Sequence, residues 1–165
     1  MKKRVLLIED NEETAMFIQA AVKDLGIDAN LDHCNRLSDG IRTILDAKLD
    51  YYDLILLDIL LPDTLLDNPM QGLISIRQST LSPILVISVD GDLVNQAVHS
   101  GRAQDGLVKG FSMYSLRHLL RRYLLPIEDT LQESVSIGMV DEATESVYRT
   151  IRNLRRLDAE DNDNA

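Results

Sequence analysis

The sequence predicts an α/β protein built on a doubly wound parallel sheet of five strands. Short, strongly apolar runs of strand length recur along its 165 residues. Segments with apolar residues at helical spacing alternate with these runs. Several of the runs end abruptly in acidic or other polar residues. Regular alternation of strands and helices favours parallel strands joined by right-handed crossovers, with helices on both faces of the sheet.

The first third of the chain predicts two strands and two helices. Residues 4–8 form an apolar run that stops at acidic residues, as expected of a buried parallel strand whose carboxyl end opens into a site. Apolar residues recur at helical spacing over residues 12–25, and Gly26 follows where a helix C-cap is expected. Residues 27–34 alternate loosely, as in a strand. Ser38 is expected to cap the second helix, whose apolar side chains are Ile41, Ile44 and Leu45.

The rest of the domain repeats the alternation three times. The predicted strands are the apolar runs at residues 53–57, 84–87 and 107–108. The predicted helices follow them over residues 73–76, 93–98 and 116–123. A stretch rich in proline and aspartate, beginning at Pro62, separates the third strand from its helix.

The helical pattern is interrupted at Pro126, so we expect one domain over residues 1–125. A helical extension is expected over residues 126–157, because apolar residues recur there at helical spacing. This helix either packs on its own domain or pairs with another chain, and a homodimer is one form of the second arrangement. Residues 158–165 are acidic and too polar to bury, so we expect a disordered tail.

Composition excludes several classes of function. The apolar share is 45%, but no apolar run approaches the ~20 residues of a membrane span. The basic start of the chain leads into a strand without a cleavage-like site, which predicts a cytoplasmic protein. Cys34 is the single cysteine, so an intramolecular disulfide or a structural zinc site is not expected. A formal charge of −10 opposes direct binding to nucleic acid or anionic membranes.

Polar side chains follow four of the predicted strands, at Glu9, Asp10, Asp58, Ser88 and Lys109. In a doubly wound sheet these strand ends converge on one edge, where such sheets bind ligands. Taken singly, an aspartate after a strand is more often a turn residue or a helix cap. The prediction of a site rests on five residues of suitable types at the ends of four of the five predicted strands.

Three clustered carboxylates repel one another and raise each other's pKa unless a cation lies between them. Oxygen ligands of this kind suit Mg²⁺ better than zinc. A metal beside an aspartate neutralises an incoming phosphoryl group, Lys109 adds a second positive charge, and the Ser88 hydroxyl can donate to a phosphoryl oxygen. The combination predicts phosphoryl transfer in which positioning and charge neutralisation supply most of the catalysis.

The sequence resembles the response-regulator receiver family over about residues 2–125. The matching stretches are residues 5–11, 54–62, 83–88 and 104–109. The resemblance implies a flavodoxin-like (βα)5 fold and a single-domain protein of a two-component or phosphorelay system. It also implies a cytoplasmic signalling protein, and not an enzyme beyond self-catalysed phosphoryl transfer and autodephosphorylation. A histidine kinase or a histidine phosphotransfer protein would be the donor, and a downstream protein would receive the signal.

The same resemblance implies a role for each site residue. Asp58 would be the phosphoacceptor. Glu9, Asp10, Asp58 and the backbone carbonyl of Leu60 would hold Mg²⁺. Ser88 would be the switch hydroxyl, and Lys109 would be the family's lysine.

Four departures from the family pattern bear on how the signal leaves the domain. Gly106 stands where the family usually has an aromatic switch residue, and Gly110 stands where a proline commonly follows the lysine. Residues 63–71 look like an insertion, and Val89 replaces a smaller residue beside the switch hydroxyl. Without the aromatic ring, we expect the change to be read through the fourth helix, residues 63–71 or the C-terminal helix.

Three alternatives remain beside the phosphoacceptor. The strongest is a degenerate receiver that binds proteins without phosphorylation. Gly106, Val89 and the insertion at residues 63–71 favour it, whereas the presence of Asp10, Asp58 and Lys109 opposes it. A haloacid-dehalogenase-type phosphatase needs an acid where Leu60 stands. A flavodoxin-like FMN module needs a phosphate-binding loop where acidic residues follow the first strand. The histidines, His33, His99 and His118, are interpreted as surface or packing residues.

Overall fold

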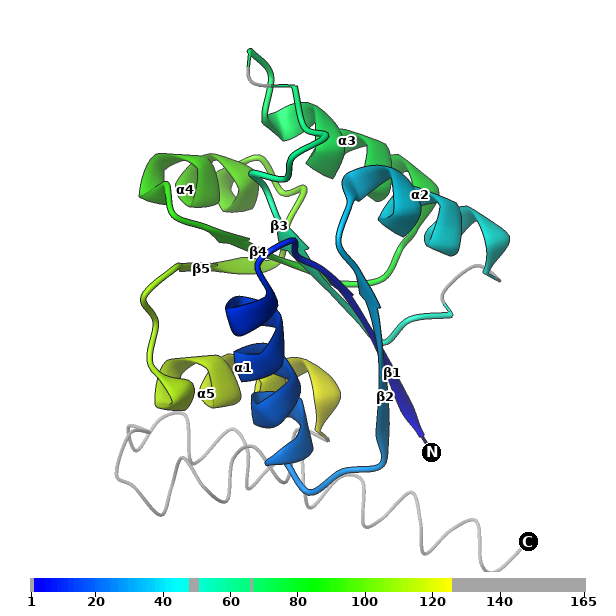
Figure 1. The fold of residues 1–165 in the computed structure, drawn as a ribbon, viewed down its shortest axis with the longest axis vertical. Coiled ribbons are helices and arrows are strands. Elements are labelled where there is room, and N and C mark those ends of the chain that lie inside the picture. The colour runs from blue at the N-terminus through cyan, green and yellow to red at the C-terminus, as the bar shows by residue number, and fades with distance from the viewer. Residues whose placement is uncertain (1, 48–50, 66, 126–165) are drawn as a thin grey trace, which may run out of the picture. The chain divides into compact units, whose positions relative to one another are not determined.

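Strands and helices alternate along the chain, as the apolar runs predict. The computed structural model describes residues 2–47, 51–65 and 67–125 (Figure 1). The elements in order are β1 (Lys3–Ile8), α1 (Glu12–Lys23), β2 (Ala29–Cys34), α2 (Leu37–Asp46), β3 (Leu54–Asp58), α3 (Met70–Ser79), β4 (Ile84–Ser88), α4 (Gly91–His99), β5 (Asp105–Val108) and α5 (Met113–Leu124). The predicted α/β fold class, with a five-stranded parallel sheet, is confirmed.

The five strands form one parallel sheet in the order β2-β1-β3-β4-β5. The order reverses between β1 and β3, which is the point where ligands bind in sheets of this kind. The register brings the strand ends level: Ile8 pairs with Leu57, and Asp58 pairs with Ile87. The residues that follow β1, β3 and β4 therefore meet at one edge.

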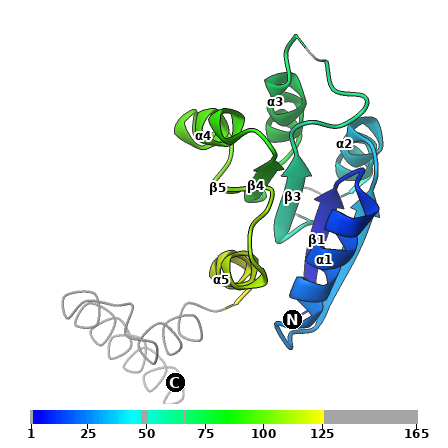
Figure 2. The same ribbon diagram turned by 60° about the vertical axis from the view of Figure 1, so that its left-hand side comes forward.

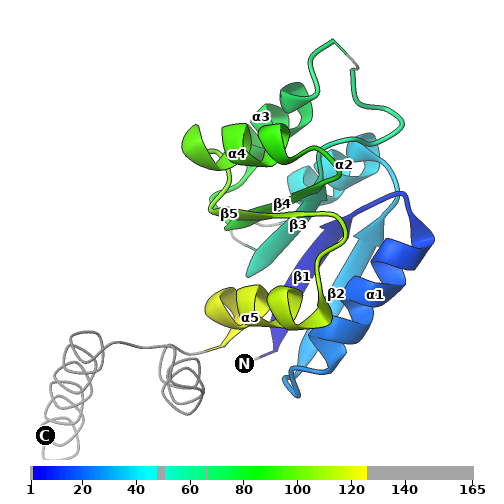
Figure 3. The ribbon, with the colours of Figure 1, turned by 90° about the vertical axis from the view of Figure 1, so that its left-hand side faces the viewer.

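Two helical layers cover the sheet, as Figures 2 and 3 show from different sides. Side chains of α2, α3 and α4 pack on one face, over a buried cluster that includes Leu6, Ile55 and Val86. Side chains of α1 and α5 pack on the other face, over a cluster that includes Leu7 and Leu56. Because every residue of β3 and β4 is buried, the polar ends of these central strands are held in a rigid frame.

Several predicted boundaries change by a few residues, and one predicted cap is wrong. Helix α1 ends at Lys23, and Gly26 adopts the left-handed backbone that a residue with a Cβ rarely takes, with φ of 68°. Helix α2 begins at Leu37, before Ser38, and the carboxylate of Asp63 accepts hydrogen bonds from the backbone N–H groups of both residues. Leu45, predicted to face the core, is 65% exposed.

The segment at residues 63–71 that was interpreted as an insertion is shorter than expected, because Met70 and Gln71 already belong to α3.

Among the described residues, none of the helices is long and apolar enough to cross a membrane. The predicted helical extension at 126–157 and the acidic tail at 158–165 lie outside the described residues.

Candidate functional site

Three carboxylates meet at the carboxyl edge of the sheet. Glu9 and Asp10 follow β1, and Asp58 ends the neighbouring strand β3. One carboxylate oxygen from each residue lies within 4.8 Å of the other two. Glu9 is fully buried and Asp58 is 3% exposed, whereas Asp10 is exposed. The predicted acidic cluster therefore forms, with two acids in the protein interior and one at the solvent side.

Lys109 joins this cluster from the end of β5. Its Nζ lies 2.6 Å from Oδ2 of Asp58 and 2.8 Å from Oε1 of Glu9. Its backbone N–H donates to the carbonyl of Ser88, at 2.7 Å, which ties the loop to the end of β4. Burial alone would lower the pKa of Lys109, but the hydrogen bonds and charges of Asp58 and Glu9 outweigh it and raise the pKa. The amine is thus held as a cation between two buried carboxylates.

Glu9 is the most constrained acid of the cluster. Its Oε1 accepts hydrogen bonds from Lys109 Nζ and from the backbone N–H of Asn11, at 3.0 Å. Its Oε2 is buried and has no hydrogen-bond partner within the described part of the chain. Burial raises the pKa of Glu9, and the charge of Asp58 adds to this, although the Lys109 hydrogen bond opposes it. An unpaired buried carboxylate oxygen is costly, and a cation in contact with it removes that cost.

The donor set fits a hard divalent cation. Every side-chain ligand offered by Glu9, Asp10 and Asp58 is a carboxylate oxygen, which Mg²⁺ prefers to nitrogen or sulfur. The exposed position of Asp10 leaves room for the water molecules that Mg²⁺ usually keeps. The unpaired Oε2 of Glu9 supplies an oxygen whose remaining lone pairs are free for a metal.

Ser88 and Leu60 lie on the two segments beside Asp58. The backbone N–H of Leu60 donates to Oδ1 of Asp58 at 3.0 Å. Ser88 ends β4, next to the strand that carries Asp58, and is fully buried. Its Oγ accepts from the backbone N–H of Asp90 at 3.2 Å. The structure thus brings all the predicted site residues to one edge, and their roles as metal ligand or switch hydroxyl stay predictions.

The sequence analysis did not predict the roles of two residues beside the site. Asp90 is the N-cap of α4, because its Oδ1 accepts from the backbone N–H groups of Asp92 and Leu93. An aspartate directly before a helical pattern is a recognisable cap signal, so this role could have been predicted. His33, interpreted as a surface or packing residue, has Nε2 2.8 Å from the backbone carbonyl of Glu9. Nothing in the sequence pattern indicates that contact, because it joins neighbouring strands.

The structure also shows two of the departures from the family pattern. Gly110 follows the lysine with φ of 97°, a conformation open to glycine. Val89 follows Ser88 and is 67% exposed, so its side chain lies largely in solvent.

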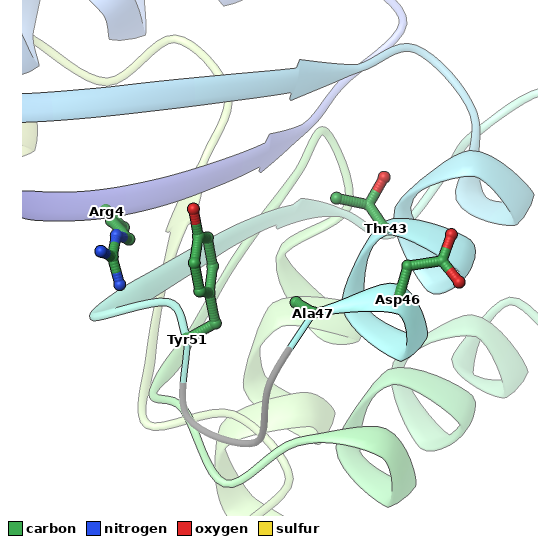
Figure 4. A pocket seen from close by; sticks show the side chains of 5 residues that line it. All are labelled: Arg4, Thr43, Asp46, Ala47 and Tyr51. Carbon is green, nitrogen blue, oxygen red and sulfur yellow. The ribbon is translucent and has the colours of Figure 1, made fainter.

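Away from this edge, an open hollow at the opposite end of the sheet is lined by Arg4, Tyr51 and residues at the end of α2 (Figure 4).

Comparison with known proteins agrees with this arrangement. No family model matches the chain. The response regulator ArlR of Staphylococcus saprophyticus is 30% identical over 124 residues, which are 72% of this chain and 53% of that protein. The transcriptional activator protein IrlR of Burkholderia pseudomallei is 28% identical over 125 residues, 72% of this chain and 51% of that protein.

The chain contains a receiver domain of the response-regulator family. A two-component response regulator from Clostridium difficile superposes on this receiver domain with a TM-score of 0.62 and 22% identity, over 74% of this chain and 96% of that one. The receiver domain of a Pseudomonas aeruginosa sensor histidine kinase, described with a magnesium ion in its active site cleft, gives a TM-score of 0.56 at 22% identity, over 74% and 98%.

These solved structures share the fold of the receiver domain at 22% sequence identity. The sequence relatives place the receiver domain within two-component signal transduction. The chain spans about half the length of the curated relatives it matches.

Proposed function

We propose that the receiver domain accepts a phosphoryl group on Asp58 in a Mg²⁺-dependent reaction. The observation that carries this proposal is the environment of the Asp58 carboxylate. It is buried and lies 2.6 Å from the Lys109 cation, in one cluster with Glu9 and Asp10. Positive charge beside a nucleophilic carboxylate is what phosphoryl transfer requires.

The reaction forms one bond and breaks another. An oxygen of the Asp58 carboxylate bonds to phosphorus, and the bond between phosphorus and the donor's nitrogen or oxygen breaks. The electron pair leaves with the donor, which is a phosphohistidine or an acyl phosphate. Lys109 neutralises charge on the phosphoryl oxygens, and the Ser88 hydroxyl donates a hydrogen bond to one of them.

Glu9, Asp10, Asp58 and the Leu60 carbonyl would hold the metal ion. When bound, Mg²⁺ supplies the second positive charge that neutralises the phosphoryl oxygens. The fit rests on an all-oxygen donor set and on the unpaired Oε2 of Glu9. The Pseudomonas receiver domain carries a magnesium ion in its own active site cleft, which supports the same cation here.

The partners follow from this chemistry. The donor would be a histidine kinase or a histidine phosphotransfer protein, and a downstream protein would receive the signal by direct contact. The domain would act as a cytoplasmic signalling phosphoacceptor, and not as an enzyme that turns over a separate substrate. The formal charge of −10 argues against direct nucleic-acid or membrane binding by this chain. A homodimer through the 126–157 segment stays a prediction.

Acetyl phosphate tests the proposal without a partner protein. With Mg²⁺, we expect the intact mass of the wild-type protein to rise by one phosphoryl group, and removal of Mg²⁺ with a chelator to prevent the rise. Asp58→Asn should not be labelled, because the nucleophilic carboxylate is gone. Asp67→Asn is the matched control, since Asp67 is an exposed aspartate in the loop after β3.

Labelling that persists in Asp58→Asn would contradict the proposal. A wild-type protein that takes no label, and binds no beryllofluoride in Mg²⁺, would favour the degenerate receiver that binds proteins without phosphorylation.

A further inference from the structure

The three acids of the cluster are held in place in different ways. Glu9 and Asp58 each accept hydrogen bonds from Lys109 Nζ and from one backbone N–H group. Within the described part of the chain, the carboxylate of Asp10 has no hydrogen bond or ion pair of this kind. One of its oxygens nevertheless lies within 4.8 Å of oxygens of the other two acids. The position of this carboxylate therefore depends on the backbone that carries it, beginning with the peptide between Glu9 and Asp10.

The side chain of His33, on the neighbouring strand β2, holds this peptide. Its Nε2 lies 2.8 Å from the backbone carbonyl oxygen of Glu9. Because a carbonyl only accepts hydrogen bonds, Nε2 must carry the proton and donate it. The carbonyl of Cys34, the next residue of β2, accepts from the backbone N–H of Glu9 at 3.0 Å. Strand β2 thus holds Glu9 at both of its backbone polar groups, one residue beyond the end of β1.

The hydrogen bond from His33 bears on Asp10 through the geometry of the peptide unit. The carbonyl of Glu9 and the nitrogen of Asp10 belong to one planar group. The orientation of that plane is set by two torsions, ψ of Glu9 and φ of Asp10. A donor that holds the carbonyl restricts both torsions, and with them the direction in which the Asp10 side chain leaves the backbone. Without the donor, the peptide can rotate toward water and the exposed carboxylate can turn away from the cluster.

We propose that His33 is a positioning residue for the metal site, and that it keeps the Asp10 carboxylate in the acidic cluster by holding the Glu9 carbonyl. This inference rests on the proposed Mg²⁺ site. The described contact of the His33 ring is with a backbone oxygen and not with a carboxylate of the cluster. Its role is therefore exerted through the backbone, as a partner that orients a ligand-bearing residue.

A Mg²⁺ titration of the full chain, followed by backbone amide resonances, measures the effect of the hydrogen bond. In His33→Ala, we expect the dissociation constant for Mg²⁺ to rise on the order of tenfold, the low end for removal of a partner that orients a metal ligand. His33→Gln should restore the affinity, because its amide nitrogen lies about as far along the side chain as Nε2 of histidine. His33→Asn should not restore it, because the same amide is one carbon closer to the backbone.

His99→Ala is the matched control. Nδ1 of His99 also lies 2.8 Å from a backbone carbonyl, that of Asn95, but both residues belong to α4. We expect this substitution to leave the Mg²⁺ affinity unchanged.

A second comparison separates positioning from a general loosening of the fold. If His33 acts through Asp10, its removal has no further effect on Mg²⁺ binding once the Asp10 carboxylate is gone. The dissociation constants of Asp10→Ala and of the double variant with His33→Ala should therefore be nearly equal. Equal losses of affinity from His33→Ala in the wild-type and Asp10→Ala backgrounds would overturn the inference.

The ring nitrogens of His33 report on the contact in the wild-type protein, without any substitution. At mildly alkaline pH, where imidazole rings are normally neutral, nitrogen NMR distinguishes the two tautomers. We expect Nε2 of His33 to carry the proton and Nδ1 to be unprotonated. A ring protonated at Nδ1 would overturn the inference, because the lone pair of Nε2 would then face the Glu9 carbonyl.

The outcomes separate this inference from the proposed function. An unchanged Mg²⁺ affinity in His33→Ala, in a protein that acetyl phosphate still labels at Asp58, would overturn the inference and leave the proposed function standing. An equal loss of affinity in His33→Ala and His33→Gln would also overturn it, because the donated hydrogen bond would then have no role. Failure of the wild type to bind Mg²⁺ would overturn the proposed Mg²⁺-dependent function, and the inference with it.

Discussion

At the scale of single residues, the two acids after β1 have different environments. Glu9 is buried, holds Lys109 and Asn11 through one oxygen, and has a second oxygen without a partner among the described residues. Asp10 is exposed. Removal of Glu9 would leave Lys109 with one carboxylate fewer in the interior, whereas removal of Asp10 takes one ligand charge from the solvent side of the cluster. Asp10 is therefore the better probe of metal binding.

We expect Asp10→Ala to weaken Mg²⁺ binding on the order of tenfold or more, because a hard cation then loses one of few charged oxygens. A Mg²⁺ titration followed by isothermal calorimetry or amide shifts measures the effect. Glu13→Ala is the control, since Glu13 is an exposed acid in the first turn of α1 and lies outside the cluster. An unchanged Mg²⁺ affinity in Asp10→Ala would place the metal site elsewhere.

The convergence of Glu9, Asp10, Asp58 and Lys109 could be predicted from the sequence, because the ends of parallel strands share one edge. The contacts of individual atoms could not. Lys109 forms salt bridges with both Glu9 and Asp58, and these depend on side-chain rotamers. The contact of His33 with the Glu9 carbonyl depends on strand order. The sequence pattern indicates neither of them.

At the scale of elements, hydrogen bonds connect the loop after β3 to the start of α2. The carboxylate of Asp63 accepts from the backbone N–H groups of Leu37 and Ser38, both at 2.9 Å. Burial alone would raise the pKa of Asp63, but the hydrogen bonds from Ser38 and Leu37 outweigh it and lower the pKa. This connection joins the segment that follows Asp58 to the start of a neighbouring helix.

We expect Asp63→Ala to lower the free energy of unfolding by about 1 kcal/mol at neutral pH, the usual cost of losing a helix cap. Because folding lowers the pKa of Asp63, its contribution is fully present above the unfolded-state value of 3.8 and is lost as pH falls through the lower folded value. Urea unfolding of both proteins from neutral to acid pH should show the difference shrinking. Asp67→Ala should change little, and a constant difference at all pH values would contradict the capping role.

The prediction that Ser38 caps α2 failed for a physical reason. A local cap is recognisable because its side chain and the helix start are adjacent in sequence. Here the cap comes from Asp63, 25 residues beyond Ser38, so it depends on how the β3–α3 loop folds back. The close approach of Val94 in α4 to Gly106 in β5 escaped prediction in the same way, since this contact exists only in three dimensions.

At the scale of the whole molecule, the fold could be predicted from the sequence because the central strands are buried on both faces. β3 and β4 are buried throughout and appear in the sequence as unbroken apolar runs. The edge strands β2 and β5 are only partly buried, and their sequence patterns are correspondingly weaker. The doubly wound order then places the acids, the lysine and the serine around one point, which is why a prediction of the fold led to a prediction of the site.

Chemical trapping of the phosphorylated residue tests the central claim most directly. Sodium borohydride reduces an aspartyl phosphate to homoserine, so the modified position can be identified by peptide mass spectrometry. After treatment with acetyl phosphate and Mg²⁺, we expect homoserine at position 58 of the wild-type protein and at no other aspartate, and none in Asp58→Asn. Homoserine at a different position, or its absence from a protein that has gained a phosphoryl group, would contradict the assignment of Asp58 as the phosphoacceptor.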